Sequence, residues 1–276
     1  MRKVGIIASG ASETDAAVIL NEDEEKRVKT EDLVLISNKC CNFHRVRSRI
    51  DKLCGNFAYY LRKFDDAKKF TGPSVYFHQR TLNRLESLGL PAALEDTIFL
   101  EYLYATLTAW GLHRMGPTGA KLVEFESFKK TLSNQKGAIA SLQAYQLTHL
   151  PEQNLDVIVD ALWNILSNLK VSETRTQIVA GSKALHHLLP KLMPPIDREY
   201  TTRFFYCEEG VKTVILPSGG EERIFKEIYP FFFEIASRNR EVIFQHIGRG
   251  FHTSETKVID NAIVGFVLEE LKREEL

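Results

Sequence analysis

The chain has 276 residues, of which 44% are hydrophobic, 10% aromatic and 26% charged, which is typical of a globular protein. Lys+Arg and Asp+Glu both number 36, so no net charge indicates a polyanionic partner, and any nucleic-acid surface must be local. No stretch approaches the roughly 20 apolar residues of a membrane helix and no signal peptide is recognisable, so we expect a soluble, cytoplasmic protein with no membrane partner.

Residues 1–38 carry the pattern of a small β appendage. Three short apolar pieces, VGIIAS, AAVIL and DLVLIS, are separated by turn-rich or charged residues, as is typical of short strands. Residues 3–37 faintly resemble the opening strands of the small β-barrel at the front of HerA-type DNA-translocating ATPases. The resemblance implies a β segment that packs on the helical body or on a protein partner. Because the chain has no GxxxxGK[ST] nucleotide loop, we expect no ATPase activity.

From Asn42 the hydrophobic period becomes helical, which predicts a mainly α fold with a helical domain over residues 39–276. The segment IFLEYLYATLTAWGL, residues 98–112, is apolar on nearly every side and predicts the central core helix. The tail ends in a predicted amphipathic helix whose N-cap is Thr253 or Ser254. The candidate helices before the tail cover residues 42–68, 74–88, 94–114, 122–132, 137–148 and 153–169.

Positive charge is concentrated between Lys39 and Arg80. This segment has ten basic and three acidic residues, interleaved with phenylalanine and tyrosine. Because basic side chains can contact phosphates and aromatic rings can stack on unpaired bases, the segment is a candidate DNA-binding surface. A solvated helix face has the same composition and stays the alternative. The candidate nucleic-acid-binding residues are Arg45, Arg47, Arg49, Arg62, Lys63 and Arg80.

The stretch GSKALHHLLPKLMPPIDREYTTRFF begins with a predicted helix over residues 181–192. Four leucines form one stripe of this helix, and Lys183 and His187, four residues apart, lie on the opposite face. The pair faces water unless a second layer covers that face, in which case it lines a cleft. The two neighbouring histidines point about 100° apart and the cysteines form no CxxC spacing, so we expect no metal and no cofactor.

Two prolines end this helix, because Pro194 and Pro195 cannot continue it. Asp197 is then the natural N-cap of the next helix, where its carboxylate accepts free backbone N–H groups. Capping explains Asp197 without any catalysis. The same geometry would also hold an ionised carboxylate at the mouth of a cleft, where it could stabilise a developing oxocarbenium ion.

The order of Gly-Ser-Lys-Ala, an apolar helix and Pro-Ile-Asp before a further helix resembles the core of the helix-hairpin-helix DNA glycosylase superfamily, of which endonuclease III is a familiar member. The resemblance covers about residues 176–206. It implies a multi-helical body that binds DNA and excises a modified or mismatched base. By position it implies Lys183 as the nucleophile and Asp197 as the carboxylate that stabilises the sugar cation, and His187, one turn from Lys183, would help to lower the pKa of the amine.

The hairpin loop of that family is replaced here by TRTQIVAGS. The same residues therefore also suit a non-catalytic helical module that binds nucleic acid or a protein partner. In that alternative Lys183 contacts a phosphate and Asp197 is only a cap.

Overall fold

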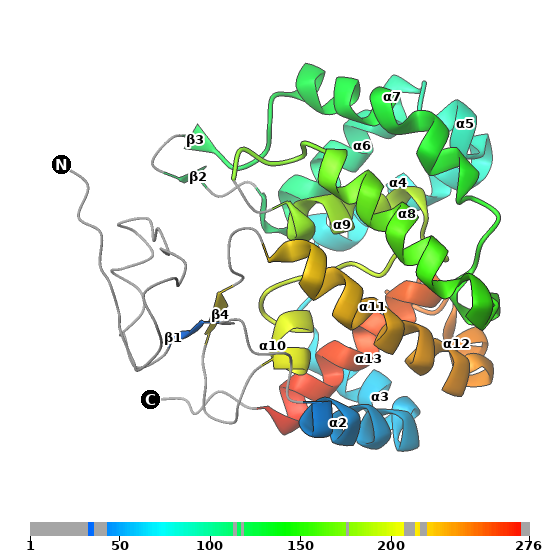
Figure 1. Cartoon of the computed structure of the whole chain (residues 1–276). Coiled ribbons are helices and arrows are strands. Elements are labelled where there is room, and N and C mark those ends of the chain that lie inside the picture. Colours follow the sequence, from blue (N-terminus) through cyan, green and yellow to red (C-terminus); the bar gives the residue numbers. More distant parts are fainter. Residues whose placement is uncertain are drawn as a thin grey trace, which may run out of the picture.

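Two groups of helices build the protein, and the prediction of a mainly α fold is confirmed. The computed structural model describes residues 33–35, 43–112, 115–116, 119–174, 177–206, 213–215 and 220–271. The upper group in Figure 1 contains α4 (Pro73–Leu88), α5 (Leu90–Ala93), α6 (Thr97–Leu107), α7 (Phe125–Ser141), α8 (Leu155–Asn168) and α9 (Ile178–Leu188). The lower group contains α2 (Phe43–Gly55), α3 (Phe57–Ala67), α10 (Thr201–Tyr206), α11 (Glu221–Arg238), α12 (Arg240–His246) and α13 (Glu255–Glu270).

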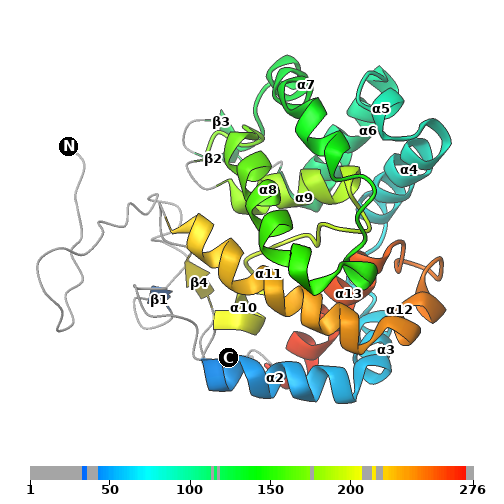
Figure 2. The same cartoon turned by 45° about the vertical axis from the view of Figure 1, so that its right-hand side comes forward.

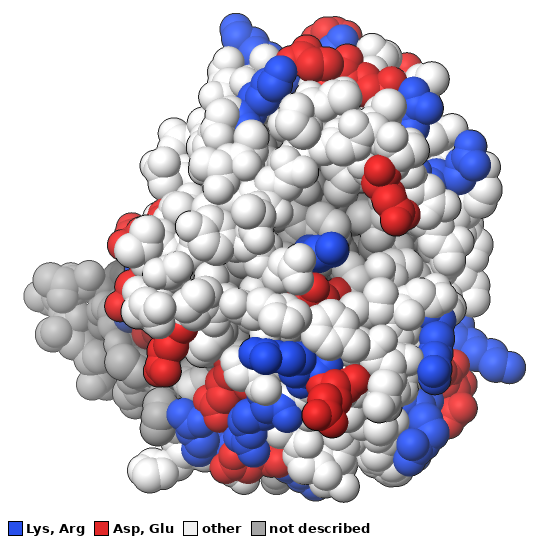
Figure 3. Space-filling view, turned by 90° about the vertical axis from the view of Figure 1, so that its right-hand side faces the viewer, with Lys and Arg blue, Asp and Glu red and all other residues white. Residues whose placement is uncertain are grey.

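The two groups meet where α11 packs against α8, and an extended segment over residues 193–197 runs from one group to the other. Figure 2 shows the same division from a second direction. On the face shown in Figure 3 the surface is hollowed near its centre, and one basic and one acidic side chain are visible inside the hollow. The walls of this hollow are mostly uncharged, whereas charged side chains of both signs gather toward the edges of the face.

The helix α13 forms the centre of the lower group. Every residue from Glu255 to Val267 is buried, and α13 packs against α2, α3, α10, α11 and α12. The predicted Ser254 cap is confirmed, since its hydroxyl accepts from the backbone N–H of Lys257 at 3.3 Å. The prediction of an amphipathic last helix is wrong, because neighbouring helices cover this helix on all sides.

The helix predicted to be central lies instead at the surface of the upper group. α6 buries Phe99, Leu103 and Leu107, but the side chain of Ile98 is 45% exposed. Apolar residues around the whole circumference of a helix indicate burial only when neighbouring elements reach every side. In the lower group the helices around α13 are numerous enough to bury it, even though α13, unlike α6, carries several charged residues.

Several predicted helix boundaries differ from those observed. The segment predicted as one helix over residues 42–68 forms two, α2 and α3, which are separated at Asn56. The segments 122–132 and 137–148 were predicted as separate helices, but α7 runs without a break from the first into the second and ends at Ser141. Gly137 interrupts the apolar pattern there, yet it lies exposed inside the helix, where a glycine costs only about 1 kcal/mol.

Short strands accompany the helices. The strand β1 (Leu33–Leu35) pairs in parallel with β4 (Thr213–Ile215), and β2 (Met115–Gly116) pairs in antiparallel fashion with β3 (Gly119–Ala120). The rest of the β appendage predicted over residues 1–38 lies outside the described residues, so that appendage stays a prediction. Within the described ranges, the helices are all too short or too polar to cross a membrane.

Gly265 of α13 lies directly against the backbone of α3. A Cβ atom at Gly265 would lie 1.9 Å from the carbonyl oxygen of Tyr60. The phenol of Tyr60 donates to Glu270 at 2.8 Å and so joins the same two helices again, one turn further on. A glycine is therefore required at position 265 by the separation of the helices, because any side chain would push α13 away from α3.

We expect Gly265→Ala to destabilise the fold by about 3 kcal/mol or more, because overpacking against a backbone cannot be relieved by a rotamer change. Urea unfolding followed by circular dichroism measures this change. Gly137→Ala is the matched control, since nothing lies within 4 Å of the added Cβ, and it should be neutral or stabilise the protein by up to about 1 kcal/mol. Equal unfolding midpoints for the two variants would contradict the close approach.

Candidate functional site

The amine of Lys183 is held by the backbone of a segment outside its own helix. Lys183 lies on α9 and is half-buried, and its Nζ donates to the carbonyl oxygen of Trp110 at 3.0 Å. Trp110 follows α6, and Gly111, with a φ of +93°, turns the chain immediately after it. A second layer therefore covers the face opposite the leucine stripe, so Lys183 and His187 do not form a water-facing pair.

A directional chain of hydrogen bonds starts at the backbone of Lys183. Because a carbonyl oxygen only accepts, His187 Nδ1–H donates to the Lys183 carbonyl at 2.7 Å. His187 Nε2 must then accept from His78 Nδ1–H, at 2.8 Å. His78 Nε2 in turn accepts from the hydroxyl of Thr253, at 2.6 Å. His187 thus bonds to His78 of α4, which in turn bonds to Thr253 in the loop before α13, and the ring nitrogens of His187 are not directed at the Lys183 amine.

Burial keeps the imidazole rings of this chain neutral. Burial, assisted by the positive charges of Lys257 and Lys183, lowers the pKa of His187 from its usual 6.5 to about 4, although the hydrogen bond to the Lys183 carbonyl opposes this decrease. Burial and the neighbouring histidine rings hold the pKa values of His78 and His186 well below their usual range. A neutral His187 supplies no positive charge near pH 7. It therefore does not lower the pKa of the Lys183 amine by charge repulsion, contrary to the role inferred from the sequence.

His186 lies fully buried beside this chain. Its Nδ1–H donates to the carbonyl of Met193 at 3.0 Å, and its ring stacks on that of His78 with 5.8 Å between centroids. Its other nitrogen, Nε2, has no hydrogen-bond partner among the described residues. An unsatisfied buried acceptor costs about 1–3 kcal/mol. The described His, Cys, Asp and Glu side chains also include no group of three or more that could hold a metal ion.

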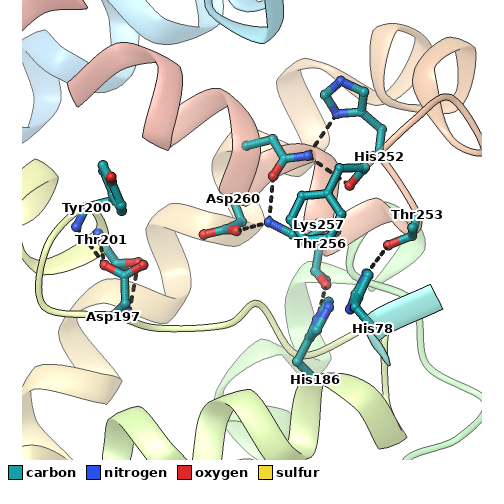
Figure 4. Close-up of polar contacts among 12 residues, drawn as sticks. His78, His186, Asp197, Tyr200, Thr201, His252, Thr253, Thr256, Lys257 and Asp260 are labelled. Atoms are coloured by element: carbon teal, nitrogen blue, oxygen red, sulfur yellow. Dashed lines mark hydrogen bonds and ion pairs between the residues drawn. The ribbon is translucent and has the colours of Figure 1, made fainter. Parts of the chain in front are cut away.

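The Asp197 carboxylate caps the turn over residues 198–200, which leads into α10, so the helix predicted to begin at Asp197 begins instead at Thr201. Its Oδ1 accepts from the backbone N–H of Tyr200 at 2.6 Å and from that of Thr201 at 3.3 Å, as Figure 4 shows. In return, the hydroxyl of Thr201 accepts from the Asp197 backbone N–H at 3.2 Å. These bonds fix the carboxylate in one position, and Asp197 keeps part of its surface in contact with solvent.

Sequence reasoning did not identify the most unusual charged residues of the fold, which lie on α13. Lys257 is only 3% exposed and Asp260 only 6%, and the Lys257 amine donates to Asp260 Oδ2 at 2.6 Å. The same amine donates to Asn261 Oδ1 at 2.5 Å. Asn261 Nδ2–H donates to His252 Nδ1 at 2.9 Å, so His252 Nε2–H donates to the carboxylate of Asp65 at 3.0 Å. The chain reaches the surface at Asp65.

Aromatic rings enclose the Lys257 amine. Its Nζ lies 4.4 Å from the centroid of Phe251 and 5.6 Å from that of Phe64. The rings of Phe70 and Trp110 lie 5.7 Å and 5.6 Å away. Such rings attract an ammonium ion through the negative charge of their faces, by about 2 kcal/mol or more where water is excluded. Phe70 and Trp110 are only partly buried, so these two rings also border the outside of the cage.

Lys183 and Asp197 both act electrostatically on Asp260. Burial raises the pKa of the Asp260 carboxyl, the charge of Asp197 raises it further, and the charges of Lys257 and Lys183 lower it. Lys183 and Asp197 are therefore both within electrostatic range of one buried carboxylate that the sequence did not point to. Figure 4 shows Asp260 between Asp197 and Lys257. We call Lys183, Asp197, Lys257 and Asp260 the charge cluster.

The predicted DNA-binding residues have varied surroundings. Arg49 is only 7% exposed and donates to the backbone carbonyls of Arg203 and Phe204, so it anchors α10. Two others are paired with carboxylates: Arg47 with Glu234 at 2.5 Å and Lys63 with Glu269 at 3.1 Å. Arg45 is partly buried on α2, Arg62 is exposed on α3, and Arg80 is exposed on α4, where it donates to the hydroxyl of Tyr102 at 3.3 Å.

An apolar groove of about 560 Å³ lies away from the charge cluster, on the outer side of α4 and α6. Pro73, Phe77, Tyr104 and Phe125 are among its lining residues, together with Ala109, which directly precedes Trp110. The groove contains no cluster of titratable groups. We therefore place the candidate functional site at the charge cluster rather than in this groove.

Comparison of the chain with protein-family models, curated proteins and solved structures gave no match. The site therefore has to be interpreted from its own geometry. The sequence signal that could have identified Lys257 and Asp260 is ETKVIDN. Lys257, Asp260 and Asn261 fall on one face there, at spacings of three and four residues, directly before the apolar run AIVGFVL.

We expect the protein to lose stability as the pH falls from 6.5 to 4. In the unfolded chain His187 binds a proton near pH 6.5, whereas in the fold it does so only near 4. Between these values the unfolded state binds more protons, so the free energy of unfolding decreases, by about 3 kcal/mol for His187 alone. Urea unfolding at a series of pH values measures the decrease.

The control for this experiment is His149→Gln, because His149 is exposed. This variant should keep the pH dependence of the original protein. His187→Gln should be less stable at pH 7, because it loses a buried hydrogen bond, but its stability should fall less steeply toward pH 4. Identical slopes for His187→Gln and the original protein would rule out His187 as a source of the acid sensitivity.

Proposed function

We propose that the protein binds DNA and that the charge cluster acts on the sugar of an unpaired nucleotide, as in an N-glycosylase. The observation that supports this proposal best is that Lys183 and Asp197 both act electrostatically on the buried Asp260, which lies beside Asp197 in Figure 4. An amine and a fixed carboxylate at the junction of two helix groups are the functional groups that cleavage of a glycosidic bond needs. The resemblance to the helix-hairpin-helix glycosylases assigns the same two residues.

In the proposed reaction the bond between C1′ and the base nitrogen breaks, and its electron pair leaves with the base. Asp197 stabilises the positive charge that develops on the sugar. Because two backbone N–H groups hold its Oδ1, the carboxylate needs little reorganisation as that charge appears.

The proposed nucleophile is Lys183, whose amine, after losing a proton to solvent, attacks C1′ and forms a new carbon–nitrogen bond. The C1′–O4′ bond then breaks, its electron pair stays on O4′, which takes up a proton as the nitrogen loses one, and the resulting imine is the species that borohydride reduces. The Trp110 carbonyl fixes the direction of the amine before that step. If water attacks instead, Asp197 still acts and no covalent intermediate forms.

A second candidate function is a non-catalytic helical module that binds a protein partner. The pairing of Arg47 and Lys63 with carboxylates favours it, because a side chain already engaged in an ion pair is less available to a phosphate. In this alternative the charge cluster serves only to fix the packing of α13. The two functions differ in whether the Lys183 amine can be trapped on DNA.

We expect borohydride to trap a covalent complex between the protein and a duplex that carries an abasic site or a damaged base. Lys183→Ala should abolish trapping, because the reduced bond is made to its amine. Asp197→Asn keeps a side-chain oxygen for the cap but removes the charge, and it should slow base release by roughly a hundred-fold. Denaturing gel electrophoresis of labelled duplexes measures both.

Lys170→Ala is the matched control for trapping, since Lys170 is a lysine whose side chain is 71% exposed. It should trap as well as the original protein. Base release without trapping would assign the reaction to Asp197 and water. The absence of both across abasic, deaminated, oxidised and alkylated substrates would overturn the enzymatic proposal in favour of the binding module.

We expect DNA binding to depend on salt, with a slope of about 0.9 in log affinity against log salt for each phosphate contacted. Arg62 and Arg80 are exposed, so reversing both charges, Arg62→Glu with Arg80→Glu, should weaken binding to every sequence alike and reduce the slope. Fluorescence anisotropy over a range of salt concentrations measures the slope. Lys170→Glu is the control for a general change in net charge, and an affinity that does not change with salt would contradict the proposal.

A further inference from the structure

One oxygen of the buried Asp260 carboxylate is not used by the fold. Oδ2 accepts from the Lys257 amine, whereas Oδ1 has no hydrogen-bond partner among the described residues. Asp260 is only 6% exposed, yet its Oδ1 is not among the fully buried side-chain atoms of the described residues that lack a partner. Since Oδ1 has no partner, it must therefore keep some contact with solvent. Figure 4 shows the carboxylate extending from Lys257 toward the side where Asp197 lies.

Folding alone does not require this arrangement. Removing two charges from water costs several kcal/mol per ion, and replacing a buried ion pair by apolar side chains of similar volume is often neutral or stabilising. A buried carboxylate that leaves one oxygen unpaired recovers still less of its desolvation cost. The position of Asp260 is thus better explained by a ligand that supplies the missing hydrogen bond.

Aromatic rings around the Lys257 amine, the partner of Asp260, offer surfaces on which a flat, unpaired base could stack. Trp110 and Phe70 enclose the Lys257 amine on one side and are only partly buried, so each keeps a surface that a ligand can reach. The ring of Phe70 also lies 6.3 Å from that of Tyr200, beside the Asp197 cap. Stacking on such rings contributes about 1–3 kcal/mol per base and does not depend on which base is present.

We infer that Asp260 is a further ligand-contacting residue, and that its Oδ1 accepts a hydrogen bond from an amino group of an unpaired base stacked against Trp110. This inference rests on the proposed function and adds a class of substrate to it, namely bases that carry an exocyclic amino group. Lys257 is a positioning residue in this site. Its amine holds the other oxygen of Asp260 and thereby turns Oδ1 toward the ligand.

Trp110 provides a direct readout, because the chain contains only two tryptophans, Trp110 and Trp163. In a Trp163→Phe background, the quenching of Trp110 fluorescence is measured during titration with two nucleosides. Adenosine carries an exocyclic amino group, and purine riboside is the same molecule without it. We expect adenosine to bind about ten-fold more tightly or better, since a hydrogen bond to a charged group contributes about 1.5–3 kcal/mol.

Two variants in this background separate recognition from folding. The double variant Lys257→Met with Asp260→Leu replaces the ion pair by apolar side chains of similar volume and should fold, but it should bind the two nucleosides equally well. Asp260→Asn keeps the shape of the side chain and should reduce the preference for adenosine. Asp160→Asn is the control, since Asp160 lies on the exposed side of α8 beside Lys226, and it should keep the full preference.

Equal affinity for the two nucleosides before Asp260 is changed would overturn the inference, as would quenching by neither. An unchanged preference in the folded double variant would also overturn it. These outcomes are independent of the trapping experiment. If the protein prefers adenosine but is not trapped on DNA, the Asp260 contact is supported and the glycosylase activity is not. If the protein is trapped on DNA but shows no preference for adenosine, the glycosylase activity is supported and the Asp260 contact is not.

Discussion

Lys257 carries its charge on a helix that other helices cover on every side. Such a position is tolerated only if the interior satisfies the ammonium group, and here Asp260, Asn261 and four aromatic rings do so. The requirement extends outward, because Asn261 can face Lys257 with its oxygen only if its amide nitrogen has acceptors, which Phe251 and His252 supply. His252 then donates to Asp65. One buried charge thereby orders contacts from α13 to the surface of α3.

The chain of hydrogen bonds through His78 and His187 also reaches the charge cluster, at the backbone of Lys183. It runs from Thr253 through His78 and His187 to the backbone of Lys183, and each proton position along it follows from the carbonyl at its end. Because the rings are neutral, the chain adds no charge next to the Lys257 amine. A protonated imidazole there would face two ammonium groups in a medium of low dielectric constant. The neutral chain therefore allows two lysines to lie near each other.

The sequence predicted the parts of this arrangement that local chemistry determines. The Asp197 carboxylate had to accept backbone N–H groups close to the start of the next helix, because the first N–H groups of a helix have no partner within it. The end of the preceding helix was predicted too late, since α9 ends at Leu188, before Pro190, and does not reach Pro194 and Pro195. The mainly α fold followed from the hydrophobic period in the same way. The covering of His187 by α4 and the burial of Arg49 under α10 could not be predicted, because both depend on which helix packs against a polar face.

The position of α13 was the main failure, and its cause is specific. Glu255, Lys257 and Asp260 within sixteen residues indicate a solvated face in most helices, so the pattern favoured an amphipathic surface helix. Gly265 is the residue that indicated burial instead. A glycine inside a helix weakens that helix, so its presence there is best explained by a neighbouring element that packs too closely for a side chain. Tyr60 of α3 occupies that space. A glycine and a charged trio on the same helix are together a better sign of a buried functional helix than either alone.

The charges of the cluster also bear on how a nucleotide could reach it. Two lysines and two aspartates leave the site without net charge, so it does not by itself attract a phosphate. On the segment predicted to bind DNA, Arg49 is buried and two basic side chains are paired with carboxylates. Few phosphate contacts leave little binding energy to unstack a paired base, which costs a few kcal/mol. A nucleotide that is already unpaired avoids this cost, and the aromatic surfaces of Trp110 and Phe70 favour it further. The proposed site therefore fits single-stranded, mismatched or damaged DNA better than an intact duplex.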